Sequence, residues 1–173
     1  VRAFVTNYRD VTARREAEDA MLETRRRLEY LISATSAVTY TARAHDDFKV
    51  TFISANLTSV LGYAPDDFYN DRMFWRSHIH PDDIAMVERE LKIVLTRPGG
   101  TVDYRFRHAD GRYRWMRDTA RIARDKDGNP IEVVGYWIDI TEQVEAQESL
   151  RRSEANFRAL IERSPTATYV QRD

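Results

Sequence analysis

Residues 101–141 read TVDYRFRHADGRYRWMRDTARIARDKDGNPIEVVGYWIDIT. Two turns, Asp110-Gly111 and Asp127-Gly128-Asn129, divide this stretch into three runs that are rich in β-branched and aromatic residues. The three runs are 101–108, 113–124 and 130–140. Strands joined by such short turns lie antiparallel, so the stretch predicts three consecutive antiparallel strands.

The sequence before these strands predicts two further strands and a helical insert. Residues 38–42 and 50–54 alternate as strands do, on either side of His45-Asp46-Asp47. The insert contains a segment that ends at Gly62, a residue type that favours a left-handed C′ cap, and a longer helix from Pro81 to Thr96. This order predicts one α+β domain over residues 35–140, a five-stranded antiparallel sheet with helices on one face.

Alternation along the strands divides their apolar side chains between two faces. We expect the inner face to carry Val102, Tyr104, Phe106, Met116, Ala120, Ile122, Val134, Tyr136, Ile138 and Ile140. The opposite parity carries Tyr113, Trp115 and Trp137, so the outer face is also partly apolar. We expect the preceding helix or a second protomer to cover that face.

The two ends of the chain are similar to each other at a fixed separation of 129 residues. Identical pairs include Asp10 with Asp139 and Thr12 with Thr141. Self-similarity at a fixed period is the signature of an array of similar units. We therefore expect the chain to be a piece of a tandem array. The expected parts are 1–12, the last strand of a preceding unit; 13–34 and 141–164, linker helices; and 165–173, the first strand of a following unit.

Both linker segments carry apolar or small residues at the alternating spacing of four and three that a coiled coil requires. The small residues Thr24 and Ser153 complete this spacing. The other residues, here called the seam, are Ala17, Met21, Leu28 and Leu31 in the first segment and Ala146, Leu150, Phe157 and Leu160 in the second. The shared register favours a parallel homodimer. The alternative is that each helix packs against its own domain.

Composition excludes several classes of function. Charged residues make up 32% of the chain, hydrophobic residues 42%, and the net charge is −1. Because acidic and basic residues are interspersed, and no apolar run is long enough to cross a bilayer, we expect neither nucleic-acid binding nor membrane contact in this segment. The chain has no Cys, which excludes disulfides, thiolate catalysis and cysteinyl-flavin adducts here. A cytoplasmic location is expected, with a periplasmic one left open.

Seven short motifs follow one another across the central unit. They are Phe52-Ile53-Ser54-Ala55-Asn56, Leu61-Gly62-Tyr63, His80-Pro81-Asp82-Asp83, Tyr104-Arg105-Phe106-Arg107, Asp110-Gly111-Arg112-Tyr113-Arg114-Trp115, Asp127-Gly128 and Gly135-Tyr136-Trp137-Ile138-Asp139-Ile140-Thr141. In order and spacing this combination resembles a PAS domain with its C-terminal PAC motif, of the bacterial signalling type that occurs in tandem. The resemblance implies a five-stranded antiparallel sheet that often encloses a ligand or cofactor, and linker helices that pass conformational change to an effector.

The resemblance also places a junction between domain and linker. The Asp-Ile-Thr stretch lies where the last strand becomes the helix, and Asp139 can cap that helix while Glu142 completes a capping box. Asp139 and Thr141 are therefore the predicted signal-transmission junction, and the repeat adds Asp10 and Thr12.

Histidines and acids suggest cofactor sites that must be weighed against simpler explanations. The run His78, His80, Asp82 and Asp83 superficially resembles a metal site, but a helix start at Pro81 explains it without a metal. We expect no metal and no catalytic residue, because no nucleophile with a base and no phosphate-binding Gly loop is present. Haem held by His78 or His80 and a non-covalent flavin stay open, although neither His lies well inside the 81–96 helix.

The aromatic residues of the strands form a candidate pocket, with plain hydrophobic core as the alternative. Its residues are Tyr40, Phe52, Tyr104, Phe106, Met116 and Tyr136. We predict a non-catalytic sensory or relay module of a multi-PAS bacterial protein. Its expected partners are a second copy, neighbouring PAS units, an effector domain of the same chain and a candidate small-molecule ligand. Alternatives are a haem-, flavin- or metabolite-binding sensor, a fragment of a histidine kinase or diguanylate cyclase, and a ligand-free spacer.

Overall fold

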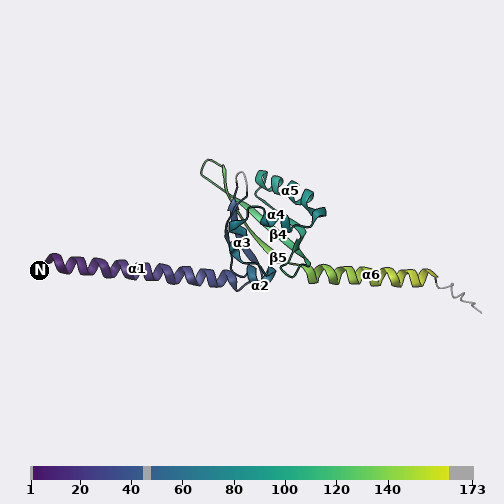
Figure 1. The fold of residues 1–173 in the computed structure, drawn as a ribbon, viewed down its shortest axis with the longest axis horizontal. Helices are drawn as coiled ribbons and strands as arrows, with labels where there is room; N and C mark the ends of the chain where they lie inside the picture. Colours follow the sequence, from purple (N-terminus) through teal and green to yellow (C-terminus); the bar gives the residue numbers. More distant parts are fainter. Residues whose placement is uncertain (1, 45–47, 164–173) are drawn as a thin grey trace, which may run out of the picture. The chain divides into compact units, whose positions relative to one another are not determined.

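A computed structural model describes residues 2–44 and 48–163, side chains at 2–13, 95 and 162–163 excepted. The elements are α1 (Arg2–Ser33), β1 (Val38–Arg43), β2 (Val50–Ile53), α2 (Leu57–Leu61), α3 (Pro65–Asn70), α4 (Phe74–His78), α5 (Pro81–Thr96), β3 (Gly99–Arg107), β4 (Tyr113–Arg124), β5 (Pro130–Asp139) and α6 (Thr141–Arg163). The chain forms two compact units, Val1–Asp139 and Ile140–Asp173. Figure 1 shows the elements along the chain.

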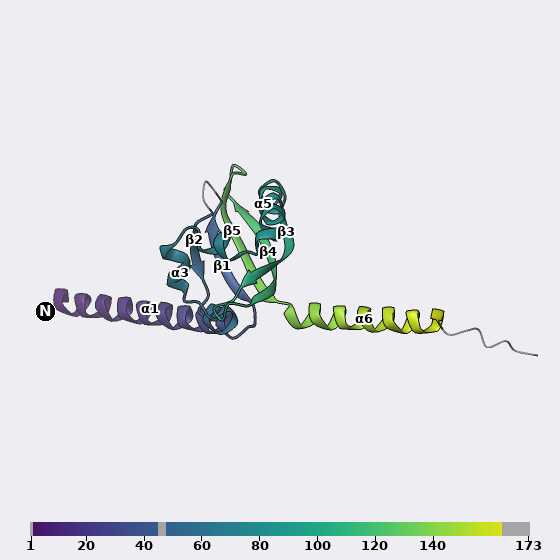
Figure 2. The same ribbon diagram turned by 45° about the vertical axis from the view of Figure 1, so that its right-hand side comes forward.

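The five strands form a single sheet in the order β2-β1-β5-β4-β3, and every neighbouring pair is antiparallel. The last strand, β5, therefore lies at the centre, between the first hairpin and the β3–β4 hairpin. Figure 2 shows α3 beside β2 and α5 beside β3. The predicted α+β fold with a five-stranded antiparallel sheet is confirmed.

The helical insert buries its apolar side chains against one face of this sheet. Leu57, Leu61, Phe68 and Val87 from the helices share a core with Tyr104, Phe106, Met116 and Trp137 from the strands. Two predicted helix boundaries are present. Gly62 ends α2 with φ of 78°, a left-handed conformation that glycine adopts without steric cost. His80, directly before Pro81, is the N-cap of α5, and its ring accepts a hydrogen bond from the Asp82 N–H.

The predicted parity of β5 is wrong. Val134 and Tyr136, expected inside, are each 41% exposed, whereas Val133 and Trp137 are buried. Both faces of β5 carry apolar residues, so alternation alone does not choose between them. Burying Trp137 removes more apolar surface from water than burying Tyr136, and Gly135 on the same face leaves space for a side chain from β1. The predicted inner positions Tyr104, Phe106, Met116 and Ala120 on β3 and β4 are buried.

The first residues of the chain also differ from expectation. Residues 2–12, predicted to be a strand, belong to helix α1. A strand needs a neighbour to satisfy its N–H and C=O groups, whereas a helix satisfies them internally, so a segment without a partner strand favours the helix. The predicted strand over 165–173 and the turn at 45–47 lie outside the described residues. In the described part of the chain, no helix combines the length and apolarity that crossing a membrane requires.

Candidate functional site

A cavity of about 280 Å³ lies between the sheet and the helices α3, α4 and α5. Its walls are mainly aromatic and aliphatic, and its mouth is formed by charged side chains, several of them exposed. The lining residues are Tyr40, Ala42, Phe48, Val50, Phe68, Met73, Trp75, Leu91, Asp118, Val133 and Trp137, with Lys49, Asp71, Arg72, Arg76, Glu88 and Lys92 as the charged ones nearer the mouth. An apolar hollow with few polar groups is the usual form of a small-molecule site.

A buried acid, Asp118, lies in the cavity wall, and its residue is 8% exposed. The Tyr40 hydroxyl donates to Asp118 Oδ1 at 2.8 Å, and the Tyr104 hydroxyl donates to Oδ2 at 3.4 Å. Trp75 Nε1 donates in turn to the Tyr104 hydroxyl at 2.9 Å. This chain of hydrogen bonds joins α4 to β3, β4 and β1 through one buried acid.

The register of the sheet explains how these groups meet. Tyr40 on β1 lies opposite Gly135 on β5, and Asp118 on β4 lies opposite Trp137 on β5. A Cβ at Gly135 would come within 2.5 Å of the Tyr40 ring. The missing side chain at Gly135 therefore lets the Tyr40 ring cross the central strand and reach Asp118, two strands away.

Burial governs the electrostatics of this network. Loss of solvation raises the pKa of Asp118 from 3.8 to about 6, although the neighbouring Trp137, Tyr40 and Tyr104 groups act in the opposite direction. The same burial, with the nearby Asp118 charge, raises the pKa of Tyr40 and of Tyr104 well above 10.0. The two phenols therefore stay protonated and serve as donors, while the carboxyl group is poised to titrate near neutrality.

Trp137 lines the cavity and places a buried polar atom near Asp118. Its side chain is 3% exposed, and its Nε1 is buried without a hydrogen bond of good geometry to any described residue. The indole N–H lies close enough to Asp118 to lower the pKa of that carboxyl, but it does not complete a hydrogen bond with it. Asp118 and Trp137 thus lie side by side in the cavity wall, with the indole nitrogen itself buried.

The six predicted pocket residues do not all line the cavity. Tyr40 lines the cavity, while Tyr104, Phe106 and Met116 are buried in the adjoining core. Phe52 and Tyr136 belong to the opposite face of the sheet, because Phe52 pairs with Thr41 and not with the buried Tyr40, and Tyr136 follows the exposed parity of β5. For these two residues the predicted pocket is wrong.

Sequence reasoning missed Asp118, Trp75 and Trp137. For Asp118 a signal was present, since Asp118 shares its parity with Met116 and Ala120, and an acid on an apolar strand face is unusual enough to mark a site. Trp75 lies in a short helix whose orientation no periodicity fixes. Trp137 was assigned to the wrong face.

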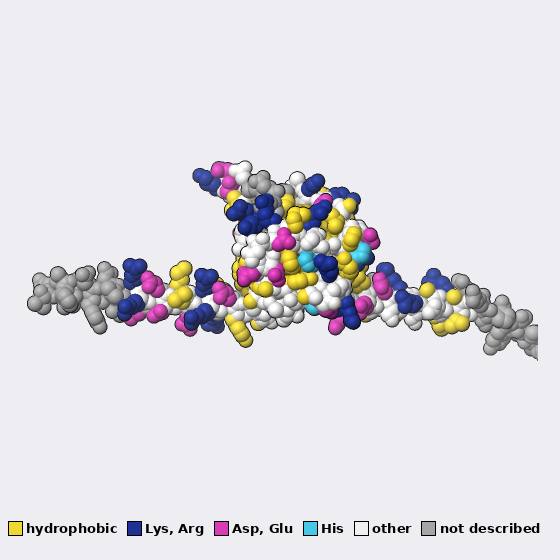
Figure 3. Space-filling view, viewed as in Figure 1, with side chains coloured by type: hydrophobic (Ala, Val, Ile, Leu, Met, Phe, Trp, Pro, Cys, Tyr) yellow, Lys and Arg dark blue, Asp and Glu magenta, His cyan; other side chains and the backbone are white. Residues whose placement is uncertain are grey.

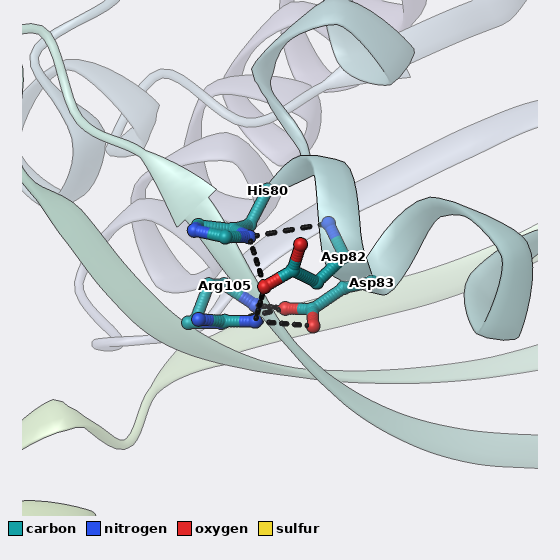
Figure 4. Close-up of polar contacts among 4 residues, drawn as sticks. All are labelled: His80, Asp82, Asp83 and Arg105. Carbon is teal, nitrogen blue, oxygen red and sulfur yellow. Dashed lines mark hydrogen bonds and ion pairs between the residues drawn. The ribbon is translucent and has the colours of Figure 1, made fainter.

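The motif around His80 forms a polar cluster at the start of α5 (Figure 4). Arg105 on β3 holds Asp83 through its Nε at 2.9 Å and its Nη2 at 2.7 Å, and its backbone N–H donates to the same carboxylate at 2.9 Å. Asp82 lies 3.5 Å from the same guanidinium and 3.6 Å from the His80 ring. These hydrogen bonds from Arg105 lower the pKa of Asp83. The cluster fastens the helix N-terminus to the sheet.

His78 and His80 lie apart from the cavity. His78 Nδ1 is 2.6 Å from the Phe74 carbonyl oxygen, and its ring stacks on Phe74 with centroids 4.1 Å apart. The His80 ring packs on Tyr113. Neither side chain lines the described cavity, so the haem ligand considered from the sequence is not directed into it. Among the described residues, no three His, Asp or Glu side chains gather closely enough to hold a metal.

The predicted junction and seam occupy the following positions. Asp139 is the last residue of β5, where it pairs with Met116, and α6 begins at Thr141, with Val144 N–H donating to the Ile140 carbonyl at 2.9 Å. Asp10 and Thr12 lie in α1, their side chains outside the described part. The seam residues Ala17, Met21, Leu28, Leu31, Ala146, Leu150, Phe157 and Leu160 are all exposed. Figure 3 shows charges of both signs interspersed along α1 and along α6.

Comparison with known proteins finds a matching family model and similar sensor proteins. The family model described as PAS fold matches residues 50–137. The two-component sensor PprA of Pseudomonas aeruginosa is 32% identical over 162 residues, which are 90% of this chain and 17% of that protein. A methyl sulfide methyltransferase-associated sensor of Methanosarcina acetivorans is 31% identical over 145 residues, 80% of this chain and 14% of that protein. This chain thus spans less than a fifth of the length of either relative.

Two solved structures are similar in fold. One is a sensory box histidine kinase/response regulator from Burkholderia thailandensis, with a TM-score of 0.61 and 27% identity, covering 77% of this chain and 98% of that one. The other is the N-terminal domain of a diguanylate cyclase with PAS/PAC sensor from Marinobacter aquaeolei, with a TM-score of 0.56 and 24% identity, covering 62% and 97%. The second likeness shows the fold alone.

Proposed function

Because this chain belongs to the PAS-fold family, we propose that it is the sensory and signal-relay part of a larger bacterial signal-transduction protein. The two relatives named above are sensor proteins, one of them a two-component sensor, and one solved neighbour is a sensory box histidine kinase/response regulator. We place catalysis in an effector domain elsewhere in the parent chain, and the module itself in the cytoplasm. The PAC motif, predicted from the resemblance, and the tandem neighbours, predicted from the sequence repeat, belong to this proposal.

One observation carries the proposal. Trp137, in the wall of the cavity, belongs to the central strand β5, which ends at Asp139, and helix α6 begins at Thr141. A ligand that moves the Trp137 side chain acts on the strand whose backbone continues into the helix. The path from cavity to helix is therefore covalent and short, which is what a relay requires.

The relay is tested by changing the cavity wall and measuring amide hydrogen exchange in residues 141–163. Val133 lines the cavity and is 2% exposed, and Val134 beside it faces the other way and is 41% exposed. We expect Val133→Leu to change exchange in β5 and in α6, and Val134→Leu to change neither. A change that stops at Asp139 in the Val133→Leu protein contradicts the relay.

We further propose that the module forms a homodimer through the seam. The seam side chains are all exposed and most are large, with Met21 at 75%, Phe157 at 66% and Leu160 at 70%. Exposed apolar residues at coiled-coil spacing favour a partner helix. Native mass spectrometry of freshly purified protein reports both the oligomeric state and any retained ligand. A dimer supports the seam. We expect Leu28→Glu to abolish the dimer and the control Arg27→Glu to keep it, which assigns the contact to the seam. A monomeric wild-type protein contradicts the proposal.

The same spectrum separates the alternatives for a bound group. An added mass of haem or flavin makes the module a cofactor-bound sensor, and the mass of a small metabolite makes it a ligand sensor. A dimer without added mass favours a relay or spacer that sets geometry for the neighbouring units.

A further inference from the structure

Three hydrogen-bond donors converge on the buried carboxyl group of Asp118. The Tyr40 hydroxyl donates to it at 2.8 Å and the Tyr104 hydroxyl at 3.4 Å. The third donor is the indole N–H of Trp137, the residue directly opposite Asp118 on β5. Its nitrogen is buried and makes no hydrogen bond of good geometry with any described residue. The Trp137 contact is therefore the one of the three that is not already made.

Two acceptors compete for this indole N–H. Burial raises the pKa of Asp118 and the nearby indole lowers it, and the same two influences act on the Tyr40 hydroxyl. The N–H therefore lies within reach of both groups. A hydrogen bond to an ionised carboxylate is roughly twice as strong as one between neutral groups. An ionised Asp118 consequently attracts the indole more strongly than the Tyr40 hydroxyl does, and a protonated Asp118 loses that advantage.

The surroundings of Asp118 allow its charge to change near neutral pH. Burial, opposed by the three donors, brings its pKa to about 6. Asp118 lines the cavity, so a proton released there reaches solvent through the mouth. Tyr40 and Tyr104 stay protonated, because burial raises their pKa values. The charged groups that line this cavity and the smaller hollow beside it have both signs, and are Lys49 before β2, Asp71 and Arg72 before α4, Arg76 on α4, and Glu88, Glu90 and Lys92 on α5.

We propose that Asp118 and Trp137 form a proton-operated switch, in which loss of the Asp118 proton to water draws the indole N–H into a hydrogen bond with the carboxylate, and return of the proton releases it. Only hydrogen bonds are exchanged besides the proton. Trp137 lies two residues before the end of β5, so the change acts on the strand that leads to α6. The inference deepens the proposed sensory function by naming the proton as its signal, and rests on that function for the path from β5 to α6.

The indole N–H signals of the whole chain, followed by proton–nitrogen NMR from about pH 5 to about pH 8, test the switch. Trp75→Phe and Trp115→Phe assign the Trp137 signal by elimination. We expect that signal to move downfield as the pH rises, with a midpoint near 6, because a stronger hydrogen bond deshields its proton. Trp115, on the opposite parity of the sheet, should give a nearly constant signal. A Trp137 signal that does not titrate, or that moves upfield, overturns the proposal.

Asp118→Asn separates this titration from that of His78. The His78 ring lies 5.7 Å from Phe106, and the Phe106 ring lies 5.8 Å from Trp137, so a charge on His78 can also disturb the indole. Asparagine keeps the shape of the acid but cannot ionise. We expect the Trp137 signal to become independent of pH in this variant. A titration that persists in Asp118→Asn belongs to another group and overturns the switch.

A pair of tyrosine variants moves the midpoint. The Tyr40 hydroxyl favours the ionised form of Asp118, so Tyr40→Phe should raise the midpoint of the Trp137 titration above that of the wild type. Tyr136→Phe makes the same change on the other face, where the side chain is 41% exposed, and should leave the midpoint in place. An equal midpoint in all three proteins contradicts the assignment of the titration to Asp118.

Amide exchange in residues 141–163 shows separately whether α6 follows the switch. The wild type and Asp118→Asn are compared at the same pH, because exchange itself depends on pH. We expect the two proteins to agree near about pH 5, where most of the wild-type Asp118 is protonated, and to differ near about pH 7.5, where it is ionised. Agreement at both values contradicts the proposed relay, while a titrating Trp137 signal by itself supports the switch.

Discussion

The Tyr40 hydroxyl donates a 2.8 Å hydrogen bond to Asp118 across the central strand of the sheet. The two residues are 78 positions apart and lie on β1 and β4, which do not pair with each other. The bond therefore links the β1–β2 hairpin to the β3–β4 hairpin through side chains in the interior, and not through backbone hydrogen bonds between strands. It also fixes the carboxylate at the cavity wall.

Removing this donor should destabilise the domain. Tyr40→Phe keeps the ring but leaves Asp118 Oδ1 without its 2.8 Å partner, so we expect a loss of about 1–3 kcal/mol in the free energy of unfolding by urea. Tyr136→Phe is the matched control, because that side chain is 41% exposed on the other face. It should change stability by less than about 0.5 kcal/mol. Similar losses in both proteins contradict the role given to the buried bond.

Asp118 should make the free energy of unfolding fall as the pH rises, which is opposite to the usual effect of an acidic residue. Its pKa rises from 3.8 to about 6 on folding, mainly because burial disfavours the charged carboxylate. The folded state therefore binds the proton more tightly than the unfolded state. The stability from this proton is full below 3.8 and is lost as the pH rises through about 6, a total of about 3 kcal/mol.

Asp118→Asn isolates this contribution from that of the other acids. Asp83 and Asp110 have lowered pKa values and act with the opposite sign, since their stabilisation is lost as the pH falls. Subtracting the unfolding free energy of Asp118→Asn from that of the wild type, from about pH 4 to about pH 8, removes their effects. We expect this difference, wild type minus variant, to fall as the pH rises. A flat difference shows that Asp118 titrates normally.

Gly135 should tolerate no side chain while Tyr40 is present. A Cβ there would lie 2.5 Å from the Tyr40 ring, so Gly135→Ala must displace the ring and should cost about 1–3 kcal/mol. In a Tyr40→Ala background the obstruction is gone, and the same change should cost much less. Urea unfolding of the two single variants and the double variant measures this coupling. Additive losses contradict the contact.

Asp83 and its neighbour Asp82 should differ in importance although both lie in the first turn of α5. The Asp83 side chain is 12% exposed and accepts three hydrogen bonds from Arg105, while that of Asp82 is 76% exposed. We expect Asp83→Ala to lower the free energy of unfolding by about 2 kcal/mol, and Asp82→Ala by less than about 1 kcal/mol. Thermal or urea unfolding compares them, and equal losses assign the effect to the helix dipole alone.

The sequence predicted the order of elements because turns and caps are local. Asp110-Gly111, Gly62 and Pro81 each determine their own few residues, and the helix and strand boundaries next to them agree with the structure. The prediction of a strand over residues 2–12 was wrong for a non-local reason. The repeat matches them to a strand, but a strand needs a neighbour, and the repeat says nothing about what lies beside them.

The site was harder to predict than the fold because it depends on register. Tyr40 reaches Asp118 only because Gly135 lies between them, and this follows from which residues face each other on three strands. Trp137 and Tyr136 are adjacent and both aromatic, so no local rule selects the one that faces the helices. The acid at position 118 was visible in the alternation of β4, but its partners come from distant segments.

Asp139 should matter to the start of α6 more than to the fold of the domain. It closes β5 opposite Met116, its side chain is exposed, and the helix begins two residues later with Glu142 in its first turn. If Asp139 supplies the predicted capping interaction, Asp139→Ala removes about 0.5–2 kcal/mol from that helix end. We expect faster amide exchange at residues 142–145, with the denaturation midpoint of the domain nearly unchanged. Asp127→Ala, in the β4–β5 turn before the opposite end of β5, removes an equal charge and should leave that exchange unaltered. Unchanged exchange at 142–145 in Asp139→Ala removes Asp139 from the junction, and loss of the whole fold shows that its role is in the domain and not in the relay.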